Sequence, residues 1–290
     1  MELRPHGPSA AGESRAEFGL LGPLTTRVNG RPVRFPSPKH RIVLAALLLN
    51  AGRAVPVEDL VNAVWGDTPP RNPRRAVQLY VTRIRASLAE EKPGQVIVTH
   101  ANGYAVEAEP DRVDLGRFEF WRDRARQAAV KGDLDAEADL LGLALTQWRG
   151  EPLADVPSNL LHQEDVPRLR EQRLSVLDRR IQVDLRRRRH AELIGELRAL
   201  TARHPFHERF WGYLMTALHG IGRRADALET YRAARRQLAE ELGIAPGAEL
   251  QALHARILAE DGGGVMCHRR PRAESGSPGA RGAGTGTWHR

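Results

Sequence analysis

The sequence has one cysteine, Cys267, few aromatic residues and no long apolar run. A single thiol excludes an internal disulfide framework and a zinc site built from several cysteines. Aromatic residues make up 5% of the chain, so leucine, valine, isoleucine and alanine must form most of the core. The apolar run over residues 42–49 is too short to span a bilayer, and residues 1–18 lack the apolar segment of a signal peptide. We therefore expect a cytoplasmic protein without a membrane partner.

Sequence motifs of catalysis and cofactor binding are also missing. The eleven histidines are scattered, and neither H-E-x-x-H nor G-x-S-x-G occurs. No G-x-x-x-x-G-K-[ST] loop is present to hold a nucleotide. Glu164 and Asp165 are adjacent carboxylates, but neighbours along a helix do not face one another, so we interpret them as a solvated helix start. We expect no enzyme activity, no catalytic residue, no metal and no cofactor.

Positive charge is concentrated in the first third of the chain. The net charge is +8; residues 27–107 contain 12 basic and 6 acidic residues, whereas residues 114–258 contain 24 and 22. An arginine-rich proteome would raise the charge everywhere and does not explain this localisation. A compact basic domain suits a polyanion, usually nucleic acid or an anionic membrane.

The order of helix, strand and turn signals predicts a winged helix-turn-helix over residues 17–109, after a disordered lead over residues 1–16. Asn29-Gly30 predicts a hairpin within an N-terminal sheet. Apolar periodicity predicts helices over residues 39–49, 56–65 and 73–90. Strands are expected over residues 95–99 and 104–107, joined by a second hairpin, the wing. Gly103 is expected to supply a positive φ in that turn.

Residues 113–260 are predicted to be entirely helical, in about seven helices separated by glycine and proline. The spacing of five apolar and aromatic residues resembles one tetratricopeptide unit: Trp211, Leu214, Ala227, Tyr231 and Ala234. A plain helical bundle is the alternative. The fold class is therefore mostly α with a small β part, a winged helix followed by tetratricopeptide-like helices. Residues 261–290 are expected to form a disordered basic tail.

The third predicted helix carries the candidate DNA-binding residues. With Val77, Val81, Ile84 and Leu88 facing inward, its polar side chains face outward. Arginine can bond bidentately to guanine, and glutamine to adenine. Most protein–DNA contacts go to the sugar–phosphate backbone of the DNA, so we expect at least half of the outward polar residues of this helix to contact phosphate. We expect DNA contact first from Arg75, Gln78, Arg83 and Arg85, then from Tyr80, with Arg74 and Thr82 on the same side. A merely solvated helix face is the alternative.

The second hairpin supplies further candidates at the tip of the wing. Its polar residues are Thr99, His100 and Asn102, which could enter a minor groove. His100 could equally be an ordinary exposed loop histidine.

These segments resemble the OmpR-type winged helix. The resemblance rests on residues 60–66 (LVNAVWG), residues 75–85 (RAVQLYVTRIR) and residues 101–104 (ANGY). It implies that Arg75, Tyr80, Arg83 and Arg85 occupy DNA-contacting positions. Gln78 does not follow from the resemblance and depends on the helix-face argument. The family wing often has a basic residue where this chain has His100.

The helical part resembles a bacterial transcriptional activation domain, through residues 113–118 (VDLGRF), 148–153 (WRGEPL) and 241–246 (ELGIAP). In this order, the two parts are similar to a Streptomyces antibiotic regulatory protein over about 240 of 290 residues. The resemblance implies an activator at the nucleoid that controls antibiotic biosynthesis genes. It also implies binding to direct repeats in double-stranded DNA as a homodimer, and recruitment of RNA polymerase and its principal sigma factor.

Three alternatives stay open at this point. A repressor would use the same DNA contacts and block polymerase. A helical scaffold would bind a peptide or a metabolite, with a winged helix that is incidental or binds RNA. The four consecutive arginines from Arg186 to Arg189 could touch DNA or only stabilise the negative end of a helix.

Overall fold

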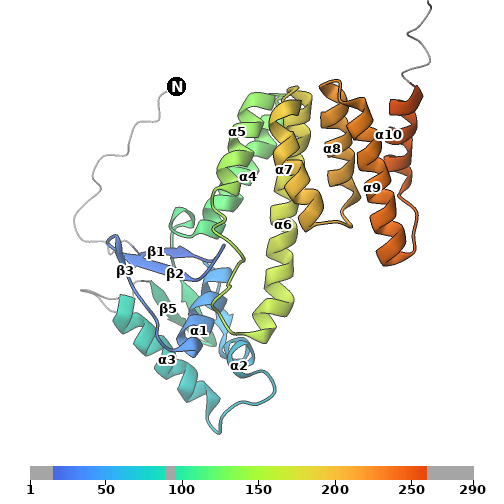
Figure 1. The fold of residues 1–290 in the computed structure, drawn as a ribbon. Helices are drawn as coiled ribbons and strands as arrows, with labels where there is room; N and C mark the ends of the chain where they lie inside the picture. Colours follow the sequence, from blue (N-terminus) through green and yellow to red (C-terminus); the bar gives the residue numbers. More distant parts are fainter. Residues whose placement is uncertain (1–15, 89–95, 260–290) are drawn as a thin grey trace, which may run out of the picture.

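The computed structural model describes residues 16–88 and 96–259. A winged helix is followed by a row of α-helices (Figure 1), which confirms the predicted mostly-α class with a small β part. The expected lead and basic tail lie outside the described residues, except that Ala16 already belongs to the first strand. No helix within the described ranges has both the length and the apolarity needed to cross a membrane.

The N-terminal sheet contains β1 (Ala16–Gly19), β2 (Thr25–Val28) and β3 (Arg31–Pro32), all antiparallel and in that order. Asn29 and Gly30 join β2 to β3 with φ angles of 52° and 77°. Two consecutive positive φ values are the signature of a tight hairpin turn, and Asn-Gly is the pair that adopts it most readily. The first predicted hairpin is thus confirmed.

The winged helix continues with α1 (Pro38–Leu49), β4 (Val55–Pro56), α2 (Val57–Trp65) and α3 (Pro73–Leu88). It ends with β5 (Ile97–His100) and β6 (Gly103–Val106), which pair as the wing. These strands and β4 form a second sheet in the order β4-β6-β5. Helix α1 lies at the centre, where its run from Ile42 to Leu48 is buried on all sides because it is apolar all round.

The expectation that Gly103 supplies a positive φ is wrong. Gly103 lies inside β6, paired with Pro56 of β4, and has no positive φ. A Cβ at this position would lie 1.9 Å from the carbonyl oxygen of Val55. Glycine is therefore required here because two backbones approach closely, and not because the turn needs it.

A short 3-10 turn, η1 (Pro110–Arg112), leads into the helical part. Its helices are α4 (Asp114–Val130), α5 (Leu134–Leu145), α6 (Asn159–Arg186), α7 (His190–Arg203), α8 (Glu208–Gly220), α9 (Arg224–Leu242) and α10 (Ala248–Ala259). Consecutive helices from α7 to α10 lie side by side (Figure 1), with Leu214, Ala227 and Ala234 buried between them. This is the packing that the repeat spacing predicts.

Helix α6 begins at Asn159, directly after a capping serine. The Ser158 hydroxyl caps it by accepting the backbone N–H of Leu161, and it donates to the carbonyl oxygen of Ala63 in α2 over 2.6 Å. The cap is buried, so one serine both starts α6 and joins it to the winged helix.

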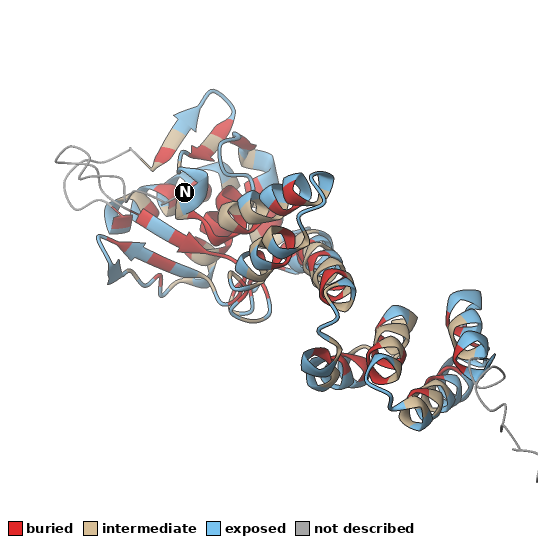
Figure 2. Cartoon of the chain, turned by 90° about the horizontal axis from the view of Figure 1, so that it is seen from above, coloured by how far each residue is buried: buried red, intermediate tan, exposed pale blue. Residues whose placement is uncertain are grey.

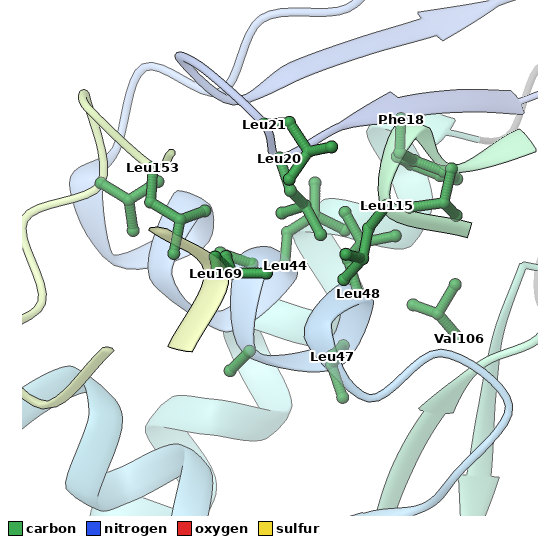
Figure 3. Close-up of a cluster of buried hydrophobic side chains, with 14 of the residues drawn as sticks. Phe18, Leu20, Leu21, Leu44, Leu47, Leu48, Val106, Leu115, Leu153 and Leu169 are labelled. Atoms are coloured by element: carbon green, nitrogen blue, oxygen red, sulfur yellow. The ribbon is translucent and has the colours of Figure 1, made fainter. Parts of the chain in front are cut away.

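One hydrophobic core extends across the winged helix and the first half of the helical part. Figure 3 shows Leu153 and Leu169 beside Leu44 of α1, and Leu115 beside Phe18. A second core begins at Ile181 and fills the space between the end of α6 and α10. Seen from above, buried positions of the winged helix continue into the adjoining helices (Figure 2). The main division between cores therefore lies within α6, well beyond the change from mixed to all-α structure near residue 113.

Candidate nucleic-acid interface

Helix α3 lies at the edge of the molecule, on the side away from α4–α10 (Figure 1). Its inward stripe is the predicted one, because Val77, Val81, Ile84 and Leu88 are all buried. This stripe packs against α1 and α2, and the opposite side of the helix is open. A helix fixed along one face and exposed along the other can enter a major groove.

Five of the predicted residues lie on the exposed side of α3: Arg74, Arg75, Gln78, Thr82 and Arg83. Arg75 and Arg83 form no ion pair with any described residue, so both guanidinium groups are available for phosphate or base contacts. Arg74 is held by Glu58 of α2 in an exposed ion pair. The Thr82 hydroxyl donates to the carbonyl oxygen of Gln78 over 2.9 Å, as threonines in helices commonly do.

Arg85 is half-buried and joins α3 to the wing. Its Nε and Nη2 atoms donate to the carbonyl oxygen of Ile97 over 3.0 and 2.8 Å, and Nη2 also donates to the Thr99 hydroxyl over 2.8 Å. The guanidinium also lies over the ring of Tyr104, 5.8 Å from its centroid. Arginine suits this role because its rigid fork can make several bonds at once. The structure therefore places Arg85 between the helix and the wing.

Tyr80 is also half-buried and belongs to a row of packed side chains from three helices. The Tyr80 ring meets the His40 ring edge to face at 5.3 Å and the Trp65 ring at 5.9 Å. The Lys39 ammonium lies over the Trp65 ring, 5.0 Å from the ring centroid. Such contacts fix ring orientation. Tyr80 can thus present only part of its ring to DNA, in one orientation.

His40 is a residue of this interface that the sequence argument missed. It is 8% exposed, and its Nε2 atom has no hydrogen-bond partner among the described residues. Burial lowers its pKa, and the nearby Arg83 charge lowers it further. Its spacing from Leu44 and Leu47, at i+4 and i+7, was a signal that it faces inward.

The wing residues His100 and Asn102 are both exposed at the tip of the β5–β6 hairpin. The carbonyl oxygen of Asn102 accepts the backbone N–H of Val57 over 3.0 Å, which ties the tip to the start of α2. The Asn102 side chain stays at the surface. The structure therefore joins α3 and the wing through Arg85 and leaves the polar tip of the wing exposed to solvent.

The four arginines from Arg186 to Arg189 lie at the far end of α6 from the winged helix (Figure 1). A helix of 28 residues is about 42 Å long, which separates this run from α3. Arg187 forms ion pairs with Asp135 and Asp184. The run belongs to the helical part and is not positioned to share one DNA contact surface with α3.

Two family descriptions match the chain. "Transcriptional regulatory protein, C terminal" matches residues 30–106, and "Bacterial transcriptional activator domain" matches residues 113–258. Regulatory protein AfsR of Streptomyces coelicolor is 43% identical over 262 residues, which cover 90% of this chain and 26% of AfsR. Regulatory protein DnrI of Streptomyces peucetius is 38% identical, with 85% of this chain and 93% of DnrI covered. The chain thus spans about a quarter of AfsR and nearly all of DnrI.

A solved structure, "Mycobacterium tuberculosis EmbR in complex with low affinity phosphopeptide", superposes with a TM-score of 0.81 at 36% sequence identity. The match covers 86% of this chain and 66% of that one. The matched families and relatives are transcriptional regulators and not enzymes, as the sequence predicts. The match to DnrI over nearly its whole length, together with both domain matches in the expected order, shows that the chain belongs to the Streptomyces antibiotic regulatory protein family of transcriptional regulators.

Proposed function

We propose that the protein is a sequence-specific DNA-binding activator of an antibiotic or other secondary-metabolite gene cluster, acting in the cytoplasm at the nucleoid. It binds direct repeats near promoters as a pair of protomers. The observation that carries the proposal is the open face of α3, where Arg75 and Arg83 are exposed beside Gln78 and have no ion-pair partner among the residues that the structure describes. Unpaired guanidinium groups are the usual donors to phosphate and to guanine.

Within this proposal the residues of the interface have different tasks. Arg75, Gln78 and Arg83 contact DNA directly, together with Arg74 once DNA displaces its exposed pair with Glu58. Tyr80 and Thr82 add contacts at the edge of the same face. His100 and Asn102 approach the adjacent minor groove. Arg85 supports binding by holding the wing at a fixed distance from α3.

Activation requires a second partner, which we propose to be RNA polymerase with its principal sigma factor. The winged helix and the first helices of the helical part share one core. These helices are therefore held in a fixed orientation relative to the DNA that the winged helix binds. Rigid coupling lets a DNA-bound protein present a surface to polymerase in a defined orientation. Direct repeats about one helical turn apart would place two protomers on the same side of the duplex.

A footprint and gel-shift titration at two salt concentrations tests DNA binding. The DNA lies upstream of neighbouring genes, with scrambled DNA as the reference. We expect protected tandem repeats that persist at higher salt, and their loss in Arg75→Ala and Arg83→Ala. Arg198→Ala, an exposed arginine of α7, is the matched control. Equal binding to both DNAs that is lost at higher salt would mean that only charge attraction holds the protein on DNA. That result would favour a scaffold role for the helical part.

A reporter assay separates activation from repression, since the same DNA contacts serve both. The site is placed upstream of a weak promoter and, in a second reporter, across a strong one. An activator raises expression from the weak promoter, and Arg83→Ala removes the increase. Expression that falls in both reporters identifies a repressor.

A further inference from the structure

A polar cleft lies beside the contact between α2 and the beginning of α6. It has a volume of about 1240 Å³ and is lined by α2, the loop after it, β4 and residues 157–165. Among the lining residues, four are acidic and one, Arg53, is a cation; the acidic residues are Asp59, Asp67, Glu164 and Asp165. Asp165 pairs with Arg168, whereas the other three carboxylates form no ion pair with a described residue. We call these four residues the acidic cleft.

The β2–β3 hairpin carries the opposite charge. Arg27 and Arg31 flank its Asn29-Gly30 turn, Arg34 follows β3, and all three are exposed. Within residues 16–88 and 96–259, none of the three has an ion-pair partner, and Arg27 donates only to the carbonyl oxygen of Gly30 over 3.4 Å. No acidic residue lies between Arg27 and Arg34. We call these three arginines the basic hairpin.

The acidic cleft and the basic hairpin lie on opposite sides of the winged helix, as the positions of α2 and β3 in Figure 1 show. One protomer therefore cannot bring its own hairpin into its own cleft. Two protomers on direct repeats point the same way along the DNA, so their contact must join two different surfaces. A positively charged surface on one side of the winged helix and a negatively charged surface on the other would complement each other in such a head-to-tail pair.

We propose that the basic hairpin of one protomer docks into the acidic cleft of a second copy bound to the adjacent repeat. This inference rests on the proposed function, because DNA is what aligns the two copies. Exposed ion pairs are individually weak and are screened by salt. The contact therefore does not hold a dimer together in free solution. It acts when DNA supplies a high effective concentration, and it appears as cooperative binding to paired repeats.

The test measures affinity for DNA with one repeat and for DNA with two repeats. The ratio of the two affinities reports the contact between copies and divides out each protomer's own affinity for DNA. Three variants are compared with wild type: R31E/R34E in the hairpin, D67R/E164R in the cleft, and all four substitutions together. R235E/R236E, two exposed arginines of α9, is the matched charge-reversal control. All these side chains are exposed, so the fold should tolerate the substitutions.

We expect each charge-reversed pair to reduce the ratio about tenfold, because like charges then face each other. The four-substitution variant should recover most of the ratio, since hairpin and cleft are again complementary. The α9 control should leave it unchanged. The ratio of the wild type should also fall as salt is raised.

Three results would overturn the inference. One is a ratio that stays at the wild-type value in both charge-reversed variants. Another is a four-substitution variant that remains as defective as its parents. A third is a cleft variant with intact cooperativity but lost transcriptional activation, which would assign the cleft to polymerase. Wild-type binding that does not distinguish repeats from scrambled DNA would instead overturn the proposed function, and the inference with it.

Discussion

Arg149 donates to the carboxylate of Asp114 over 3.1 Å, and this pair closes the junction between the winged helix and the helical part. Asp114 is 2% exposed, and its two oxygens also accept the backbone N–H groups of Leu20 and Leu21 over 2.7 and 3.0 Å. The backbone N–H of Arg149 donates in turn to the carbonyl oxygen of Leu21. The first residue of α4 therefore satisfies the backbone of a segment more than 90 residues earlier in the chain.

Asp114→Ala should lower the free energy of unfolding by about 3 kcal/mol, because two buried N–H groups lose their acceptor. Urea unfolding monitored by circular dichroism measures the change. Asp123→Ala is the control, since Asp123 is an exposed acid of the same helix that pairs with Arg122 and Arg126. It should change stability by less than about 0.5 kcal/mol. Equal effects of the two substitutions would contradict the role of Asp114 at the junction.

Arg83→Ala and Arg85→Ala should fail in different ways, although both residues face outward by helical periodicity. Arg83→Ala should lower DNA affinity about tenfold and reduce the salt dependence of binding by about one phosphate contact, with unchanged thermal stability. Arg85→Ala should lower the free energy of unfolding by about 1–2 kcal/mol, because the wing loses its three hydrogen bonds to α3.

Differential scanning fluorimetry without DNA, followed by gel-shift titration, separates the two effects. Arg85→Lys should restore little of the stability, since a lysine cannot reproduce the fork that reaches Ile97 and Thr99. A stable Arg85→Ala protein with lost DNA binding would mean that Arg85 contacts DNA and leaves the wing to be held by strand pairing alone.

The inward stripe of α3 and the Asn29-Gly30 hairpin were predictable because both depend on residues close together in the chain. Val77, Val81 and Ile84 recur at helical spacing, and the turn needs a pair that accepts positive φ. Helical periodicity also placed Arg85 on the outward side. It could not show that the wing strand passes within reach of that side chain, because the contact depends on tertiary structure.

The shared core and the role of Gly103 also depend on tertiary contacts, and for that reason they could not be predicted from the sequence. Asp114 meets Leu20 only after the chain has folded, and nothing in the local sequence signals this contact. Gly103 was assigned to a turn because glycine after Asn102 is a common turn signal. Its true constraint is a backbone contact with Val55, far earlier in the chain. Local chemistry thus predicts elements and faces, whereas long-range contacts decide what each exposed or special residue does.

Acidification should destabilise the protein through His40. Burial, and then the Arg83 charge, lower the pKa of His40 below its ordinary value of 6.5. Below pH 6.5, His40 binds a proton in the unfolded chain but stays neutral in the folded protein until the pH reaches its lowered pKa. The free energy of unfolding therefore falls as pH drops below about 6.5, and it levels off once pH is under the lowered pKa.

Unfolding of wild type and His40→Gln at about pH 7.5 and about pH 5.5 measures this contribution. The variant should lose less stability on acidification than wild type does. The stability of the His40→Gln variant should still depend on pH to some extent, because His204 and His254 also have pKa values lowered mainly by burial. Identical pH dependence in wild type and His40→Gln would show that the His40 ring is solvated in the folded protein.

Gly103→Ala should destabilise the wing, since its Cβ would lie 1.9 Å from the Val55 carbonyl oxygen and strand β4 would have to move. We expect the free energy of unfolding to fall by about 2–3 kcal/mol, measured by urea titration. DNA affinity should fall as well, because the β4–β6 pairing places the wing beside α3. Gly142→Ala in α5 is the matched control, where a Cβ meets open space, and there alanine should raise stability by up to about 1 kcal/mol. If Gly103→Ala were as stable as wild type, β4 would be free to shift, and the bonds from Arg85 would be what holds the wing in place.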